Sequence, residues 1–199
     1  MNKIGIFGGT FSPMHLGHLA VAKAALEKAE LDKIYIVPAK VNPFRKDAPP
    51  ALSDETRLEI IKLTCKDTPG LLASDIELKR GGVSYAIDTV KEIALTEKNA
   101  SSISWIMGDD SLPGLTSWHL AEELFKLCDF IVYPRRKAKA RLGGNAPTIP
   151  AGARITRLEA PFFDISSSEI RRRIKENLSL EGLVDLNVAK ILEKEPALH

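Results

Sequence analysis

Two glycines and two histidines near the start of the chain are the residues best suited to chemistry. Gly8-Gly9-Thr10 follows the apolar run of residues 4–7, and His15 and His18 come shortly after. The run predicts a buried strand, the glycines a tight turn, and His15 the start of a helix. Helix N-termini attract anions, and glycine lets a phosphate approach the backbone closely. Histidines three apart share a helical face and can reach the same oxygens. The segment therefore predicts a nucleotide triphosphate site.

The longer pattern around this turn is more specific than the turn itself. A glycine turn after an apolar strand is often only structural, and neither a G-x-G-x-x-G fingerprint nor the G-K-[ST] of a Walker loop occurs here. Residues 8–18 read G-G-T-F-x-P-x-H-x-G-H. This pattern resembles the nucleotidyltransferases that carry an H-x-G-H pair, a superfamily related to the class I aminoacyl-tRNA synthetases.

A second candidate segment is the serine-rich run at residues 164–171, D-I-S-S-S-E-I-R. Serines at a helix start cap it and leave N–H groups for a phosphate, and Arg171 one turn later adds a guanidinium. Ser166 and Glu169 could instead form a capping box that needs no ligand. The run resembles the I-S-S-[ST]-x-I-R motif of the same superfamily, which implies a clamp on the ATP triphosphate.

Three further stretches narrow the resemblance. Residues 84–89, residues 105–112 and Trp118 resemble the S-Y-T-x-D-T, I-x-G-x-D-S-L and downstream tryptophan of bacterial nicotinate-mononucleotide adenylyltransferases. The resemblance covers essentially the whole chain and separates it from the shorter pantetheine-phosphate adenylyltransferases. It implies transfer of the adenylyl group of ATP to nicotinate mononucleotide, giving deamido-NAD and pyrophosphate in NAD biosynthesis. It also implies Mg²⁺ carried mainly by the ATP phosphates, with no certain metal ligand in the chain.

The resemblance assigns residues to each role. The implied catalytic residues are Thr10, His15, His18 and Arg171. The residues implied to bind ATP are Gly8, Gly9, Thr10, Phe11, His15, His18, Gly108, Asp110, Arg135, Ile165, Ser166, Ser167 and Arg171. Those implied to bind the mononucleotide are Ala39, Phe44, Arg45, Ser84, Tyr85, Ala86 and Trp118.

The residue types suit a pyridine mononucleotide. Trp118 offers a flat face for the ring, although a tryptophan in such a segment is often a core residue. The N–H groups of Tyr85 and Ala86, at an expected helix start, could receive a carboxylate, which favours nicotinate over nicotinamide. Asp110 could accept ribose hydroxyls or help position Mg²⁺, or it could simply cap a helix that begins near Ser111.

Three positions depart from the family pattern. Ser12 stands where Asp is usual, Ala39 where Asn is common, and Phe44 where His is common. We expect Ser12 to tune the turn. Contacts from Ala39 and Phe44 to substrate are in doubt, whereas Arg45 keeps the cation of its pair.

Alternating apolar runs and helical patterns indicate an α/β fold, a Rossmann-like doubly wound parallel sheet with flanking helices. Strands are expected at residues 4–7, 33–38, 71–78, 103–107, 129–133 and 153–158. Helices are expected at residues 15–30, 53–66 (capped by Ser53), 85–97 (capped by Ser84), 118–127, 167–177 and 187–194. Each candidate site follows a strand, where such sheets bind ligands. We expect a single nucleotidyltransferase domain over residues 1–199, with a C-terminal helical segment, 166–195, packed on it.

Composition limits the partners. The chain has 199 residues, 44% of them hydrophobic and 27% charged, with a formal net charge of +2. That charge is too small to indicate nucleic acid or membrane as the main partner, and the basic run at 135–141 is typical of a solvated loop. Cys65 and Cys128 lack C-x-x-C spacing and should be small core residues in a reducing compartment. No signal peptide or membrane-length apolar run is visible, so we expect a cytoplasmic protein; a homo-oligomer is compatible with the sequence.

Two alternatives remain open at this point. One is another H-x-G-H transferase, using phosphopantetheine, a cytidylyl donor or nicotinamide mononucleotide; Trp118 and residues 84–89 speak against the first two. The other is a non-catalytic nucleotide sensor or RNA-binding relative of the synthetases. Only the basic run at 135–141 supports it, without an accompanying aromatic surface.

Overall fold

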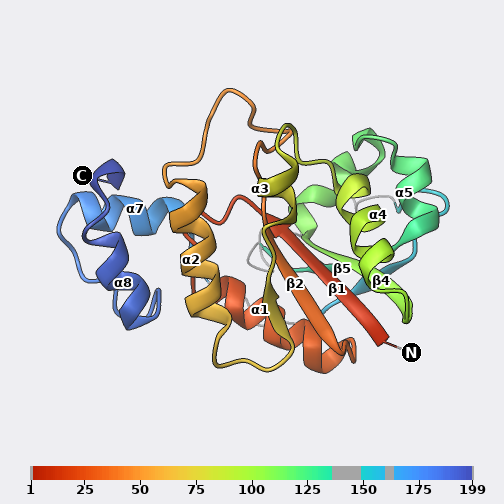
Figure 1. The fold of residues 1–199 in the computed structure, drawn as a ribbon, viewed down its shortest axis with the longest axis horizontal. Helices are drawn as coiled ribbons and strands as arrows, with labels where there is room; N and C mark the ends of the chain where they lie inside the picture. The colour runs from red at the N-terminus through yellow and green to blue at the C-terminus, as the bar shows by residue number, and fades with distance from the viewer. Residues whose placement is uncertain (1, 136–148, 160–163, 199) are drawn as a thin grey trace, which may run out of the picture.

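Six parallel strands form one sheet through the centre of the molecule (Figure 1). The computed structural model describes residues 2–135, 149–159 and 164–198. The strands are β1 (Asn2–Gly9), β2 (Lys33–Pro38), β3 (Leu71–Ala73), β4 (Ala100–Gly108), β5 (Asp129–Tyr133) and β6 (Ile155–Arg157). Their order, β3-β2-β1-β4-β5-β6, reverses between β1 and β4. Connections from these two strands diverge there, and the fold expected from the sequence is confirmed.

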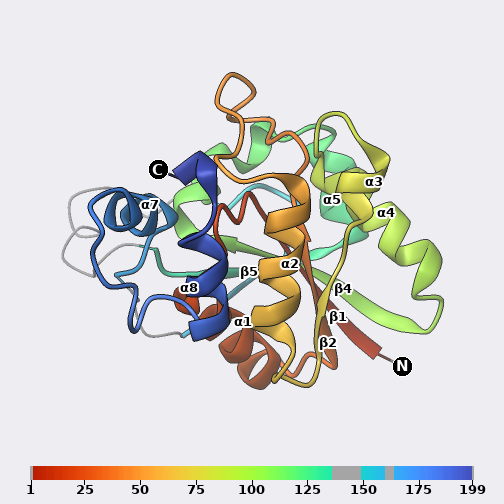
Figure 2. The same ribbon diagram turned by 60° about the vertical axis from the view of Figure 1, so that its left-hand side comes forward.

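Helices cover both faces of the sheet. One face carries α1 (Leu16–Lys28), α2 (Asp54–Cys65), α7 (Ser167–Lys175) and α8 (Leu186–Leu192). The other carries α4 (Ala86–Thr96), the 3-10 helix η1 (Asp109–Ser117) and α5 (Ala121–Leu127). The short α3 (Ile76–Arg80) links β3 to α4, and η2 (Pro196–Leu198) follows α8. Figures 1 and 2 both show α8 beside α2, so the C-terminal segment lies against the first half of the chain.

The alternation of side chains along the strands separates two apolar cores. On β5, Ile131 and Tyr133 join the core under α1 and α2, while Phe130 and Val132 join the core under α4 and α5. This alternation follows from the two-residue period of a strand. The C-terminal segment adds side chains to the first core, among them Ile170, Ile174, Val184, Val188 and Leu192. The packing of this segment therefore uses the same core as the sheet.

Several elements lie where the sequence predicts them. The strands at 33–38 and 129–133 have the expected bounds. Helix α2 begins after Ser53, whose Oγ accepts a hydrogen bond from the Thr56 N–H at 3.1 Å. Cys65 and Cys128 are buried free thiols, and burial raises the pKa of each to about 12. No helix in the described part of the chain is long and apolar enough to cross a membrane.

The strand predicted at 71–78 is wrong in its second half. Strand β3 ends at Ala73, and residues 76–80 form α3. As an edge strand, β3 pairs only with Ile34–Ile36 of β2, and the Ser74 N–H then donates to the Ile36 carbonyl at 3.0 Å. Beyond that point the chain has no strand partner, and the sequence I-E-L-K-R favours a helix.

The helix predicted at 118–127 begins later, and its predicted start is wrong. Trp118 follows the 3-10 helix η1, and Leu120 has a φ of 51°, which interrupts any regular helix before α5. The predicted cap of α4 is also wrong. Tyr85 occupies the N-cap position, and the Ser84 Oγ accepts from the Lys40 N–H at 2.8 Å instead.

The two glycines near the N-terminus belong to β1 rather than to a turn. Gly8 and Gly9 lie opposite Val37 and Pro38 of β2; the strand ends at Gly9, and the turn itself is at Ser12 and Pro13. A Cβ on Gly8 would lie 2.6 Å from the Trp105 ring, so only glycine fits there. The glycine therefore serves strand packing against β4 as well as access to the cavity above.

Candidate active site

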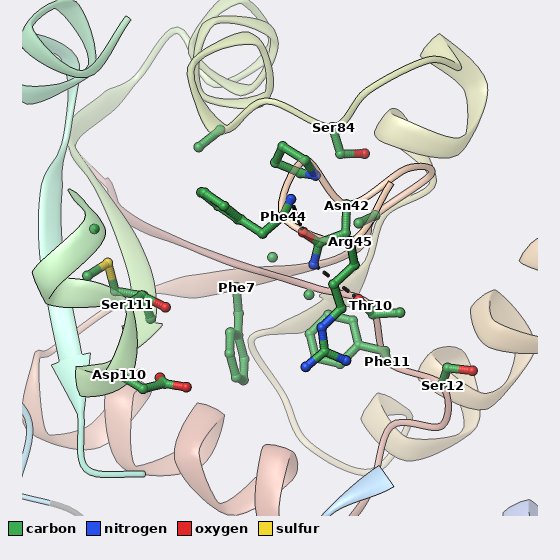
Figure 3. Close-up of a pocket in the computed structure, with 18 of the residues that line it drawn as sticks. Phe7, Thr10, Phe11, Ser12, Asn42, Phe44, Arg45, Ser84, Asp110 and Ser111 are labelled. Atoms are coloured by element: carbon green, nitrogen blue, oxygen red, sulfur yellow. Dashed lines mark hydrogen bonds between the residues drawn. The ribbon is translucent and has the colours of Figure 1, made fainter. Parts of the chain in front are cut away.

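A cavity of about 810 Å³ opens beyond the carboxyl ends of β1, β2, β4 and β5 (Figure 3). This is the edge at which a doubly wound sheet binds its ligands. The sequence-predicted residues that line it are Gly8, Gly9, Thr10, Phe11, His18, Ala39, Phe44, Arg45, Ser84, Tyr85, Ala86, Gly108, Asp110, Trp118, Arg135, Ser166, Ser167 and Arg171. His15 and Ile165 are not among the lining residues; His15 is buried beside His18, and Ile165 packs on the core.

A buried arginine supports the turn after β1. Arg57 of α2 is 0% exposed, and its Nη1 donates to the Thr10 carbonyl at 2.8 Å. Its Nη2 donates to the Asp54 carboxylate at 2.6 Å, and Asp54 also pairs with Lys40. A buried charge needs such partners to be tolerated. No pattern in the sequence indicates this role, because an arginine in the first turns of an amphipathic helix normally faces solvent.

The two histidines are arranged as a stacked pair. The His15 backbone N–H donates to Nδ1 of His18 at 3.3 Å, and the ring centroids are 3.7 Å apart. Because Nδ1 of His18 accepts, its proton must sit on Nε2, which makes the neutral ring a donor. Burial lowers the pKa of His15 to about 4 and that of His18 well below its usual value, and Arg135 adds to both shifts. Near pH 7 His18 is therefore an uncharged hydrogen-bond donor at the cavity wall.

The start of α1 differs from the expected open anion site. The Leu16 N–H donates to the Leu183 carbonyl at 2.9 Å, and the His18 N–H donates to the His15 carbonyl at 2.9 Å. The C-terminal segment thus occupies part of the helix end. Helix α1 reaches the cavity through the His18 side chain rather than through these backbone groups.

The start of α7 ties the serine-rich segment to the same turn. Ser167 Oγ donates to the Pro13 carbonyl at 2.8 Å, and Arg171 Nη1 donates to the Ser12 carbonyl at 2.6 Å. Ser166 Oγ caps the helix through the Glu169 N–H at 3.1 Å, while the Glu169 carboxylate pairs with Arg172. Ser166 and Ser167 also line the cavity, so capping of the helix leaves this segment accessible to a ligand.

Two arginines, Arg45 and Arg171, line this end of the cavity. Burial and the nearby Arg45 both lower the pKa of Arg171. Arg45 is exposed on the loop after β2, and Figure 3 shows its side chain running past Thr10 toward Phe11. Like charges that converge on one space favour an anion between them. We define Thr10, His18, Arg45 and Arg171 as the phosphate end of the cavity.

Aromatic rings form the other end. Trp118 lies with its ring centroid 6.1 Å from both Trp105 and Phe44, and Tyr85 stacks on His119 at 4.2 Å. We define this group of rings as the pyridine end, after the ring that the family resemblance leads us to expect here. Neither Trp105 nor His119 was predicted as a site residue: Trp105 reads as a strand residue, and His119 belongs to no motif.

The helix start at the pyridine end differs in one detail from the expectation. The Tyr85 N–H donates to the Val83 carbonyl at 3.1 Å, so it is already engaged. Within the described residues no backbone carbonyl accepts from the N–H of Ala86 or of His119. The donor expected from Ala86 is therefore available, and that from Tyr85 is not.

Asn42 is a further lining residue that the sequence did not reveal. Its Nδ2 lies 3.3 Å from Thr10 Oγ1, and its Oδ1 accepts from the Phe44 N–H at 2.9 Å (Figure 3). One amide thus joins the phosphate end to the loop that carries Phe44 and Arg45. No motif spacing connects residues 10 and 42, so only the folded chain brings them together.

Gly108, Asp110 and Arg135 meet at the third side of the cavity. Arg135 donates through its backbone N–H to Asp109 Oδ1 at 2.9 Å and through Nη1 to Asp110 Oδ2 at 3.2 Å. A Cβ on Gly108 would lie 2.3 Å from Arg135 Cδ, so the glycine makes room for this side chain. The rest of the basic run, residues 136–141, lies outside the described residues. Across residues 2–135, 149–159 and 164–198, no three His, Cys, Asp or Glu side chains gather as metal ligands.

Cationic side chains, a histidine donor and an aromatic slot converge at the switch point of a doubly wound sheet. This arrangement defines a nucleotide-binding protein. The sequence model of the family described as cytidylyltransferase-like matches residues 6–173. Relatives from Exiguobacterium sibiricum and Fusobacterium nucleatum, each named "probable nicotinate-nucleotide adenylyltransferase", are 34% and 36% identical. They cover 96% and 97% of this chain and 96% and 98% of their own length. The chain therefore belongs to the cytidylyltransferase-like family and, within it, to the nicotinate-nucleotide adenylyltransferases.

Solved structures agree with this fold. The Plasmodium falciparum nicotinic acid mononucleotide adenylyltransferase complexed with NaAD superposes with a TM-score of 0.76 at 18% identity, covering 98% of this chain and 96% of that one. The same enzyme complexed with APC gives a TM-score of 0.73 at 17% identity, with the same coverage. At these identities the likeness shows the shared architecture.

Proposed function

We propose that this protein transfers the adenylyl group of ATP to nicotinate mononucleotide, forming deamido-NAD and pyrophosphate. The observation that carries the proposal is a single cavity with a cationic phosphate end and an aromatic pyridine end. Those two ends match the two substrates whose phosphates must meet. The names of relatives that align over nearly the whole chain support the same reaction.

The chemistry at the phosphate end needs charge neutralisation and alignment rather than a base. A mononucleotide phosphate has a second pKa of about 6 and is already ionised near neutral pH. Its oxygen attacks the α-phosphorus of ATP, and the bond from that phosphorus to the bridging oxygen breaks to release pyrophosphate. We assign the Nε2–H of His18 to an α-phosphate oxygen and the guanidinium groups of Arg45 and Arg171 to the outer phosphates. A neutral His18 fits this role, because no proton has to be removed.

Mg²⁺ belongs to the proposal as a companion of ATP. The side chains around the phosphate end are cations and neutral donors, and the nearby Asp110 carboxylate is engaged by Arg135. This donor set fits a metal that arrives on the phosphates and adds positive charge there. The protein's own part is then to hold the triphosphate and exclude misaligned geometries.

The proposed partners are small nucleotides, in a reducing compartment. A cavity of about 810 Å³ lies within the range typical of small-molecule sites. Two buried free thiols, Cys65 and Cys128, support a reducing environment and hence the cytoplasm as the proposed location.

The proposal is tested by comparing the acid and amide mononucleotides in a coupled assay with ATP. Charge-assisted hydrogen bonds are about twice as strong as neutral ones, so the free N–H of Ala86 should favour the carboxylate. We expect kcat/KM for the acid to exceed that for the amide by about 10-fold to 100-fold. Equal use of both would remove the assigned role of Ala86, and absence of turnover with both would overturn the proposed reaction.

A further inference from the structure

Glu77 is a buried carboxylate on the wall of the cavity that the proposed reaction does not use. It lies on the short helix α3, is 3% exposed and lines the cavity beside Ser84. Burial raises the pKa of its carboxyl, and hydrogen bonds from the Thr89 and Ser84 hydroxyls oppose that shift. Burying a carboxylate costs free energy unless hydrogen bonds or an opposite charge compensate for the lost hydration.

Its hydrogen bonds run in one direction. Thr89 Oγ1 donates to Glu77 Oε1 at 2.6 Å. The Ser84 hydroxyl lines the cavity beside the same carboxyl group and lowers the pKa of that group. Each hydroxyl oxygen also accepts a hydrogen bond: Thr89 from Arg80 Nη2 at 3.1 Å, and Ser84 from the Lys40 N–H at 2.8 Å. An ionised carboxylate can only accept, so the hydrogen in each of these contacts comes from the hydroxyl; for Thr89 the other acceptor, the Tyr85 carbonyl, is more distant at 3.5 Å. The Glu77 carboxylate is thus the last acceptor in two series of polar contacts, one through Thr89 and one through Ser84.

The placement of these two hydroxyls matters for the pyridine end. Ser84 precedes Ala86 in the sequence and Thr89 follows it. Glu77 therefore contacts the start of α4 on both sides of the Ala86 N–H. Ser84 Oγ also accepts from the N–H of Lys40, in the loop after β2. The neighbouring Ala39 donates its own N–H to the Gly9 carbonyl at 2.8 Å. One carboxylate therefore connects α3, α4 and the loop after β2.

We propose that Glu77 is a positioning residue for the pyridine end, holding the N-terminus of α4 so that the Ala86 N–H meets the carboxylate of the mononucleotide. The inference rests on the proposed function. A glutamine amide is uncharged and has one acceptor oxygen instead of two, so the two hydroxyls lose their charge-assisted acceptor. Glu77→Gln therefore keeps the shape of the side chain and weakens both contacts.

The experiment measures steady-state kinetics of Glu77→Gln with ATP, the acid mononucleotide and the amide mononucleotide. We expect KM for the acid to rise about fivefold to tenfold, the acid-over-amide ratio of kcat/KM to fall by a similar factor, and KM for ATP to stay within about twofold. Ser84→Ala removes one of the two hydroxyl contacts and keeps the buried carboxylate. It should lower the acid-over-amide ratio of kcat/KM as well. It carries the test if Glu77→Gln does not fold.

The matched control is Glu92→Gln. It removes the outer ion pair with Arg80, 2.8 Å long, and leaves both hydroxyl contacts to Glu77 in place. Its acid-over-amide ratio should equal that of the unaltered protein. An unchanged ratio in a folded Glu77→Gln protein, or equal KM changes for ATP and the acid, would overturn the inference. Failure of the unaltered protein to use either mononucleotide would instead overturn the proposed function.

Discussion

The phosphate end and the pyridine end of the cavity are built in different ways. The turn after β1 is held through its backbone carbonyls, with Arg57 on Thr10 and Arg171 on Ser12. These arginines come from α2 and α7, far apart in the chain. The pyridine end draws mainly on residues 77–119 and on ring contacts, with Phe44 62% exposed at its rim.

This difference separates two tasks. Charges and backbone groups fixed from several elements are preorganised for the moment of transfer, because they need not move as charge develops. Aromatic walls with a half-open rim bind a flat ring without demanding one geometry. We therefore expect changes at the phosphate end to lower kcat or ATP affinity, and changes at the pyridine end to raise KM for the mononucleotide.

The largest effect should come from His18→Ala. Loss of the Nε2–H donor to the transferring phosphate should lower kcat by about 100-fold or more, as the loss of a transition-state donor does. Steady-state kinetics and circular dichroism of the purified variant check this. His18→Gln, which can keep a donor at the same reach, should retain more activity than His18→Ala. Near-normal turnover by a folded His18→Ala protein would leave His18 with a packing role only.

Acid stability offers the next test, at His15, whose ring stacks on His18 of the phosphate end. Burial lowers the pKa of His15 from 6.5 to about 4, so the folded protein binds fewer protons than the unfolded chain between these values. The stability is thus complete above about pH 6.5 and lost as the pH falls toward 4. We expect His15 to account for about 2 kcal/mol of the unfolding free energy lost between about pH 7 and pH 5.

Denaturant unfolding of His15→Gln at both pH values measures this contribution. The variant should lose less stability on acidification than the unaltered protein. Identical pH dependence in the two proteins would show that His15 protonates as easily in the folded state as in the unfolded one.

Removal of Arg171 should weaken ATP binding about tenfold and leave mononucleotide binding nearly unchanged, since a charge-assisted contact is lost only at the triphosphate. Separate binding titrations measure the two ligands. Arg172→Ala is the matched control, because Arg172 lies on the same helix but pairs with Glu169 and Glu176 at the surface. Equal losses for both ligands in Arg171→Ala would indicate collapse of α7 instead.

The smallest effect should come from Trp118→Ala. Stacking is worth on the order of 1 kcal/mol beyond burial, so KM should rise about fivefold for the acid and the amide alike. Kinetics with both mononucleotides test this, and Trp118→Phe should recover part of the loss. A change confined to one mononucleotide would mean that Trp118 senses the ring substituent, and the two ends would then differ less than described.

The sequence predicted what local pattern controls. The period of apolar residues placed β2 and β5 at their observed bounds, and Ser53 marked the start of α2. The motifs placed most of the lining residues, because they lie at the carboxyl ends of strands that the fold brings to one edge. These predictions need no knowledge of which distant segments touch.

The parts that failed depend on distant partners or single dihedral angles. Strand β3 is short because β2 alone borders it, and α5 starts late because Leu120 has a positive φ. Asn42, Arg57 and Glu77 escaped notice because their partners Thr10 and Thr89 become neighbours only on folding. The engagement of the Tyr85 N–H by Val83 is a local detail that no motif encodes.

The contacts of the C-terminal segment with the first turn have a consequence for synthesis of the protein. Leu183, Arg171 and Ser167 contact Leu16, Ser12 and Pro13, so the turn is complete only when residues made more than 150 positions later have folded onto it. Because a chain emerges from the ribosome N-terminus first, the sheet can assemble before this turn is finished. A nascent chain would therefore have a nearly complete fold while its ATP-binding site is still incomplete.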